Sequence, residues 1–106
     1  IRFLDTQHPD LIAYSKAAGD NLIVVVVSLN PHNACEGQLV LPLHDLGLPA
    51  DEAFSAHDLL HDAHYTWQGT HHYLRLSPDR PAHIFRLEPA GTSEQTHAAY
   101  DRLVHA

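Results

Sequence analysis

The sequence predicts an all-β fold: an antiparallel β-sandwich of about eight short strands, followed by a short C-terminal helix. The first observation is the stretch Asn-Leu-Ile-Val-Val-Val-Val-Ser-Leu-Asn-Pro at residues 21–31. β-Branched residues favour strands, and a continuous apolar run bounded by turn residues is typical of a strand covered on both faces. The second is that turn signals recur about every ten residues, which favours a sandwich over βαβ units.

The remaining strands are predicted from apolar alternation between the turns. They span residues 1–6, 11–17, 38–43, 53–59, 64–67, 70–76 and 82–87. Gly19-Asp20-Asn21 predicts a hairpin turn into the valine strand, because Gly and Asn tolerate positive φ. Residues 30–37 are expected to be a loop, and residues 45–51 a turn-rich connection with about one helical turn.

The sequence also predicts which residues share a face in strand 38–43 and how strands 64–67 and 70–76 pair. In 38–43, Leu39, Leu41 and Leu43 share one face, and Pro42 indicates a sheet edge or a bulge. Strands 64–67 and 70–76 are expected to pair as a hairpin, with Tyr65 and Trp67 on one face.

The chain is predicted to divide into a sandwich domain over residues 1–87 and a linker with a short helix over residues 88–106. Thr92 and Gln95 have the spacing of a capping box. After them, one helical stripe gathers Ala99, Tyr100, Leu103 and Val104.

Length and charge restrict the class of protein. A chain of 106 residues with 44% hydrophobic and 18% charged residues suits one small globular domain. Its net charge of −7 argues against binding to nucleic acid or to an anionic membrane. Eleven histidines would move that charge to +4 on full protonation (−7 + 11), so stability should depend on pH between about 5 and 7.

The single cysteine, Cys35, excludes an internal disulfide and favours a reducing, cytoplasmic compartment. The chain starts at Ile1 without an initiator Met and is expected to be part of a longer polypeptide. Cys35 and His32 in one loop could in principle activate a thiol, but no third group orients them, so nucleophilic catalysis is not predicted.

The densest group of potential metal ligands is His57, His61 and His64 with Asp58 and Asp62. Its spacing matches no common zinc motif, so a solvated turn is the preferred interpretation and no metal is expected. Asp58 and Asp62 are likewise interpreted as solvated charges and not as an acid–base pair. His71 and His72 must face opposite sides of a strand and cannot chelate together.

An aromatic platform is the one candidate binding site. Tyr65, Trp67 and Tyr73 could stack against sugar rings if they are exposed, although a lone Trp in a small sandwich is more often core or interface. By residue chemistry alone, the chain is not predicted to be an enzyme or to hold a cofactor.

Several stretches, in this order and spacing, resemble one family. They are residues 11–16, 24–32, 36–37, 46–49, 57–60 (His-Asp-Leu-Leu), 65–69 (Tyr-Thr-Trp-Gln-Gly), 73–76 and 80–87 (Arg-Pro-Ala-His-Ile-Phe-Arg-Leu). Together they resemble the C-terminal β-sandwich of the α-1,4-glucan:maltose-1-phosphate maltosyltransferases, in the α-amylase superfamily (glycoside hydrolase family 13). The resemblance covers residues 1–87.

The resemblance implies an amylase-type sandwich packed on a catalytic (β/α)₈ barrel of the same polypeptide. That barrel would transfer maltosyl units to α-1,4-glucans with retention, using carboxylates at its strand ends. None of those motifs lies in this sequence, so no catalytic residue is assigned. The chain is expected to stabilise the barrel through one exposed apolar face. The alternatives are an α-glucan-binding module that uses Tyr65, Trp67 and Tyr73, and a small metal protein in which His57, His61 and His64 converge.

Overall fold

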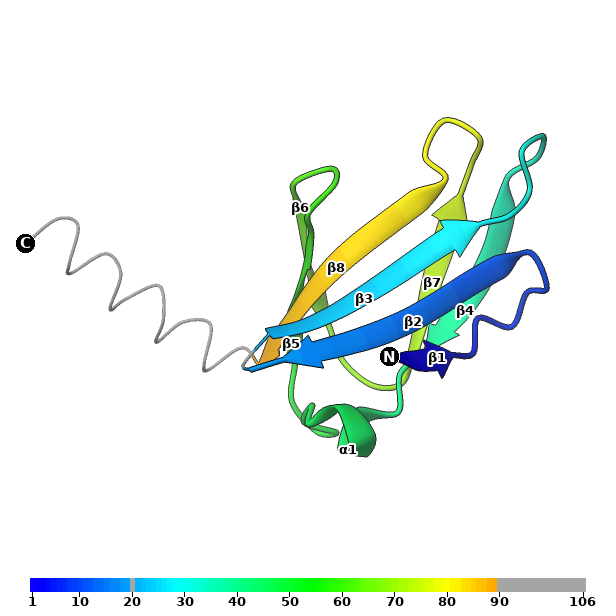
Figure 1. The fold of residues 1–106 in the computed structure, drawn as a ribbon. Coiled ribbons are helices and arrows are strands. Elements are labelled where there is room, and N and C mark those ends of the chain that lie inside the picture. The colour runs from blue at the N-terminus through cyan, green and yellow to red at the C-terminus, as the bar shows by residue number, and fades with distance from the viewer. Residues whose placement is uncertain (20, 90–106) are drawn as a thin grey trace, which may run out of the picture.

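The computed structural model describes residues 1–19 and 21–89, and within them it is an all-β protein with eight strands and one short helix (Figure 1). All strand pairs are antiparallel, which confirms the predicted fold class. The elements are β1 (Arg2–Leu4), β2 (Leu11–Ala18), β3 (Asn21–Ser28), β4 (Cys35–Val40), α1 (Leu43–Leu46), β5 (Phe54–Asp58), β6 (Ala63–Trp67), β7 (His71–Leu76) and β8 (Ala82–Pro89).

Two sheets of unequal size form the sandwich. The large sheet has the order β1-β2-β3-β8-β5-β6, and the small one is the pair β4-β7, which lies behind β2 and β3 in Figure 1. Alternate residues of the large sheet, including Val24, Val26, Phe54 and Phe85, point toward the small sheet and are almost fully buried. We call this side of the large sheet its inner face and the opposite side its outer face.

The valine strand β3 lies in the interior of the large sheet and pairs with β2 on one side and β8 on the other. The β2–β3 hairpin is tight, because Ala18 pairs directly with Asn21. Gly19 has φ of 60°, a left-handed conformation that Gly adopts without steric cost. The turn chemistry predicted from the sequence is therefore confirmed at Gly19.

Close backbone packing explains the glycine in β4. The segment before β2 runs along the edge of β4, where the Gln38 N–H donates to the Thr6 carbonyl at 3.0 Å. A Cβ on Gly37 would lie 2.5 Å from that same Thr6 carbonyl oxygen. Position 37 therefore has no room for a side chain unless the backbone of residues 5–8 moves.

The fourth strand is displaced from its predicted position. It covers Cys35–Val40 instead of 38–43, because Pro42 ends the extended segment and stands at the N-cap of α1. Leu39, Leu41 and Leu43 are nevertheless all buried, so the alternation identified their burial although Leu43 belongs to the helix. Cys35 is a buried strand residue opposite Leu76 and not a loop residue.

The predicted hairpin between 64–67 and 70–76 is wrong. β6 pairs with β5 in the large sheet, whereas β7 pairs with β4 in the small one. The chain crosses between the layers after Trp67, and the Trp67 ring stacks on His72 with centroids 4.4 Å apart. Two short strands joined by a Gly-containing turn thus belong to different sheets instead of pairing with each other.

The last strand continues to Pro89, past the predicted end at Leu87, because Glu88 and Pro89 pair with Ser55 and Phe54. The predicted helix, with its capping box at Thr92 and Gln95, lies outside the described residues. Among the residues that the structure describes, no helix is long and apolar enough to cross a membrane.

Candidate functional sites

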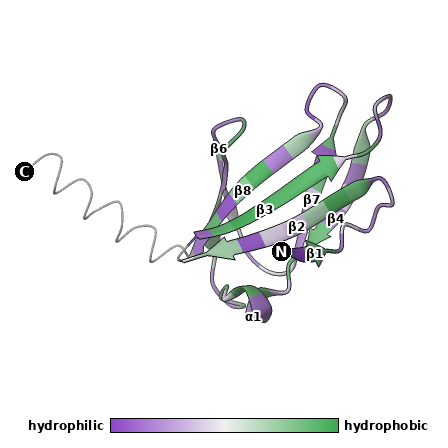
Figure 2. Ribbon diagram, in the orientation of Figure 1, coloured by the Kyte–Doolittle hydropathy of each residue, from purple (hydrophilic) through white to green (hydrophobic). Residues whose placement is uncertain are grey.

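The outer face of the large sheet is apolar across its first four strands. The register aligns Phe3, Tyr14, Val25 and Ile84 in one row. Neighbouring rows contain Ile12 opposite Val27 and Lys16 opposite Ile23. Phe3 is 75% exposed and Ile12 38% exposed, while the β3 residues on this side are half-buried only by their neighbours. Figure 2 shows β3 coloured hydrophobic along its length.

Arg86 adds a polar feature to this face. It lies in the row between Ile23 and His57, and its Nε is buried without a hydrogen-bond partner among the described residues. A buried N–H without an acceptor costs about 1–3 kcal/mol, so buried polar groups are normally paired. An acceptor supplied from outside these residues would remove that cost.

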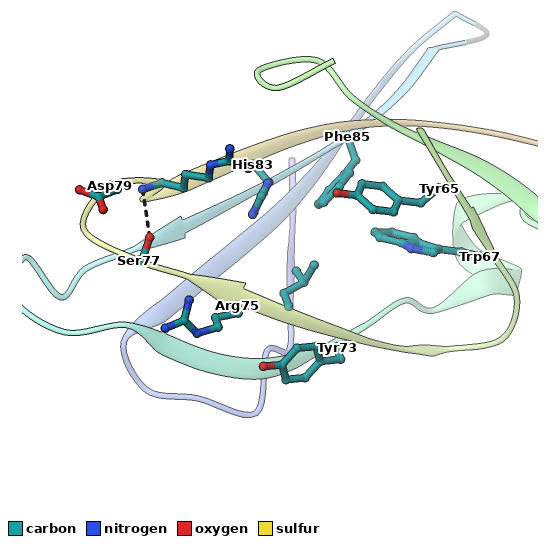
Figure 3. Close-up of a pocket in the computed structure, with 10 residues that line it drawn as sticks. Tyr65, Trp67, Tyr73, Arg75, Ser77, Asp79, His83 and Phe85 are labelled. Carbon is teal, nitrogen blue, oxygen red and sulfur yellow. Dashed lines mark hydrogen bonds between the residues drawn. The ribbon is translucent and has the colours of Figure 1, made fainter. Parts of the chain in front are cut away.

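The second candidate site is a cleft of about 540 Å³ at the part of the inner face that the small sheet leaves uncovered (Figure 3). Tyr65 and Trp67 on β6 and Phe85 on β8 line its aromatic end. The other residues around it are Tyr73, Leu74, Arg75, Ser77, Asp79, Arg80 and His83. The cleft therefore joins an aromatic wall to a polar one.

The structure brings two of the three predicted aromatic residues together. Tyr65 and Trp67 stack with ring centroids 6.4 Å apart and planes 25° apart, and Tyr65 is 45% exposed. Tyr73 is 61% exposed but belongs to the outward-facing side of β7, since His72 and Leu74 on either side of it are buried. Figure 3 accordingly draws Tyr73 across the β7 ribbon from the other two rings.

The histidines and aspartates of residues 57–64 form two separate clusters, one on each face of the β5–β6 hairpin. On the outer face, His57 stacks on His64 with ring centroids 4.0 Å apart, and His57 Nε2 lies 2.9 Å from Asp62 Oδ1. His61 lies in the inner cluster, so the convergence of His57, His61 and His64 that the alternative metal-protein interpretation requires does not occur. Among the described residues, each cluster has three potential metal ligands.

The inner cluster is centred on Asp58, whose side chain is fully buried. Its Oδ2 accepts hydrogen bonds from His61 Nδ1 at 2.8 Å and His83 Nδ1 at 2.7 Å, and its Oδ1 accepts the Leu60 N–H at 3.1 Å. Burial by itself would raise the pKa of Asp58, but these three hydrogen bonds hold that pKa below its usual range. The interpretation of Asp58 as a solvated charge is therefore wrong, because strand alternation turns it into the core.

Asp58 and Asp62 cannot act as a carboxylate pair, since they lie on opposite faces of the hairpin. His83 is the member of this cluster that sequence reasoning missed. The sequence carries no local signal for it, because His83 reaches this cluster through the pairing of Phe85 with Asp58, two residues that are distant in sequence. His71 is exposed and His72 buried, which confirms that they face opposite sides of β7.

Comparisons with known proteins agree with the fold. A family model described as the C-terminal part of GlgE matches residues 3–87. The chain is 96% identical, over all 106 residues, to 16% of an α-1,4-glucan:maltose-1-phosphate maltosyltransferase of Salinibacter ruber. It is 35% identical over 91 residues to the protein of that name from Picrophilus torridus, covering 85% of this chain and 14% of that relative. Maltosyltransferase 2 of Streptomyces coelicolor is 40% identical over 88 residues, covering 82% of this chain and 13% of that relative. The chain thus spans about a sixth of the length of these relatives or less.

Proposed function

Because this chain belongs to the GlgE C-terminal family, we propose that it is the non-catalytic C-terminal domain of a maltosyltransferase that extends α-1,4-glucans from maltose 1-phosphate. In this proposal it packs on the catalytic barrel of the same polypeptide and stabilises it. The outer face of the large sheet is the docking surface. The reaction itself takes place in the barrel.

The observation that carries this proposal is the difference between the outer face and an ordinary solvated sheet. An antiparallel sheet with one solvated side alternates apolar and polar residues. β3 instead has Ile23, Val25 and Val27 on its outer side, opposite buried Leu22, Val24 and Val26. Contiguous exposed apolar surface of this kind is typical of an interaction site.

The edges of the outer face supply a polar rim. Lys16 and Arg86 lie in the row that borders the apolar rows, together with His57. Interfaces commonly combine an apolar centre with polar groups at the rim. Arg86 Nε, which lacks an acceptor within the described residues, fits a carboxylate or a carbonyl of the docked barrel.

The test is a pair of substitutions in the full-length polypeptide. Val25→Asp places a charge in the centre of the outer face, whereas Tyr73→Asp places one on the outward side of the small sheet. We expect Val25→Asp to separate the thermal unfolding of this domain from that of the barrel and to lower maltosyl transfer. Tyr73→Asp should leave both unchanged. Equal behaviour of the two variants would contradict docking through the outer face.

A further inference from the structure

The cleft between β6, β7 and β8 has the composition of a saccharide site. We propose that it binds a segment of α-1,4-glucan, with sugar rings against Tyr65 and Trp67 and sugar hydroxyls hydrogen-bonded to His83 and Arg80. The geometry of the cleft argues for a saccharide, and the choice of an α-1,4-linked glucan rests on the proposed function. The site is distinct from the outer face, which uses the other side of the large sheet.

The aromatic wall provides the apolar contact. Tyr65 and Trp67 are two positions apart on β6, so both side chains project from the inner face of the sheet. Their planes differ by only 25°, which gives two nearly parallel rings along the strand. The Trp67 ring is fixed by stacking on His72 and by its contact with Phe85, with centroids 4.8 Å apart. Rigid aromatic surface costs little conformational entropy when a ligand binds.

The polar wall provides directional contacts. Arg80 and Asp79, in the turn between β7 and β8, offer guanidinium donors and carboxylate acceptors to the cleft. Figure 3 shows His83 projecting from β8 into the space between this turn and the aromatic wall. A few positioned polar groups beside aromatic side chains are the usual composition of a site for a small polar ligand.

His83 is held in one orientation by the buried carboxylate of Asp58. The bond of 2.7 Å from His83 Nδ1 to Asp58 Oδ2 places the proton of the neutral ring on Nδ1. His83 Nε2, which bonds to no other described residue, is then an acceptor for a sugar hydroxyl. The ring also stacks on Phe85, with centroids 5.4 Å apart, which further limits its rotation. This arrangement gives the buried Asp58 a role as a positioning residue.

The test is a titration of the chain with maltohexaose, followed by amide chemical shifts. We expect saturating shifts on β6, on the 77–80 turn and at His83, with a dissociation constant in the millimolar range. Tyr65→Ala and Arg80→Ala alter side chains that are not buried, so both variants should fold. Each should weaken binding about tenfold. Phe3→Ala is the matched control, because Phe3 is an exposed aromatic residue on the outer face and does not line the cleft, and it should change affinity less than about twofold.

Three outcomes would overturn the proposal. One is the absence of saturable shifts from maltohexaose, and another is equal weakening by Phe3→Ala and Tyr65→Ala. The third is binding of cellohexaose with the same affinity, which would reject the α-1,4 assignment. None of these results bears on Val25→Asp in the full-length polypeptide, so failure of this inference is distinguishable from failure of the docking proposal.

Discussion

The two faces of the large sheet have similar composition but different surroundings. On the inner face, Val24 and Val26 are fully buried beneath the small sheet. On the outer face of the same strand, Val25 and Val27 are covered only by neighbouring side chains of their own sheet. A continuous apolar run predicts a strand covered on both faces. This chain covers one of them, and the proposed function assigns the other to the barrel.

The apolar residues on both sides of β3 favour a packing layer on each side, and the small sheet supplies only one of these layers. An ordinary edge or half-solvated strand would carry polar residues at positions 23, 25 and 27. The residues actually present favour a second layer on that side. Four variants should show how far buried and exposed positions of the sandwich differ in their contribution to stability.

The largest effect is expected from Val24→Asp, compared with Val25→Asp in this chain. Val24 is 0% exposed, so its replacement buries an unpaired carboxylate, a change that costs several kcal/mol. We expect loss of cooperative unfolding by circular dichroism. Val25→Asp, one position away on the outer face, should cost less than about 1 kcal/mol. Similar losses at both positions would show that the two faces are equally buried.

The next effect is expected from Asp58→Asn, compared with Asp62→Asn. Asp58 Oδ2 accepts from two histidines in the core, whereas the side chain of Asp62 is 87% exposed. Loss of charge-assisted hydrogen bonds in the core should lower the free energy of unfolding by about 2–3 kcal/mol. The exposed pair should contribute less than about 1 kcal/mol. Urea denaturation of both variants at pH 7 measures the difference, and equal losses would contradict it.

A smaller effect is expected from Gly37→Ala. The added methyl group would lie 2.5 Å from the Thr6 carbonyl oxygen, so the segment before β2 must move away from β4. We expect a loss of about 1–3 kcal/mol in urea denaturation. Gly69→Ala is a useful comparison, because Gly69 has φ of 86° but open space around its Cβ position, and it tests strain without a clash. A stable Gly37→Ala variant would show that this backbone contact is loose.

The smallest effect is a dependence of stability on pH through His72. Burial lowers the pKa of His72, an effect that the hydrogen bond from His72 Nε2 to the Gly69 carbonyl opposes only in part. In the unfolded chain His72 binds a proton near pH 6.5, whereas in the folded chain it binds one only at lower pH. The free energy of unfolding is therefore unaffected by His72 above that pH and decreases below it. The denaturation midpoint of the parent chain should decrease as the pH is lowered from 7.5 to 5.5. It should decrease less in His72→Phe. An identical slope in both proteins would assign the dependence to other histidines.

Asp58 adds a second acid-sensitive range at lower pH. Its pKa is depressed in the folded state, so its contribution is present above the usual pKa of an aspartate and disappears as pH falls through the lower, folded value. The Asp58→Asn variant should lack this second decline. The measurement is the same denaturation series extended below pH 4.

Much of the fold followed from local chemistry. The run at 22–27 is apolar at every position, and Gly19 supplies the positive φ of the hairpin, so β3 and its turn were predictable. The partner of β6 was not predictable. Two short strands separated by a turn have the same local sequence pattern whether they pair with each other or belong to different sheets. Strand pairing across the sandwich depends on contacts between residues distant in sequence, such as Asp58 with Phe85.

The sites show the same limit. Tyr65 and Trp67 could be placed together because residues two apart share a strand face. Tyr73 and His83 could not be assigned to the cleft correctly, since their positions depend on which layer β7 and β8 occupy. Proximity in sequence groups His61 with His57, whereas His57 stacks on His64 at the outer face and His61 bonds to the buried Asp58 on the inner one.

The most direct test of docking through the outer face is the reactivity of a thiol placed on it. Ile12→Cys introduces one at a position that is 38% exposed, while the native Cys35 is 2% exposed and should react slowly. If the outer face docks on the barrel, an alkylating reagent labels Cys at position 12 rapidly in this chain and at least about tenfold more slowly in the full-length polypeptide. Tyr73→Cys, on the outward side of the small sheet, should react at similar rates in both. Equal labelling rates of Ile12→Cys in the two proteins would contradict docking through the outer face.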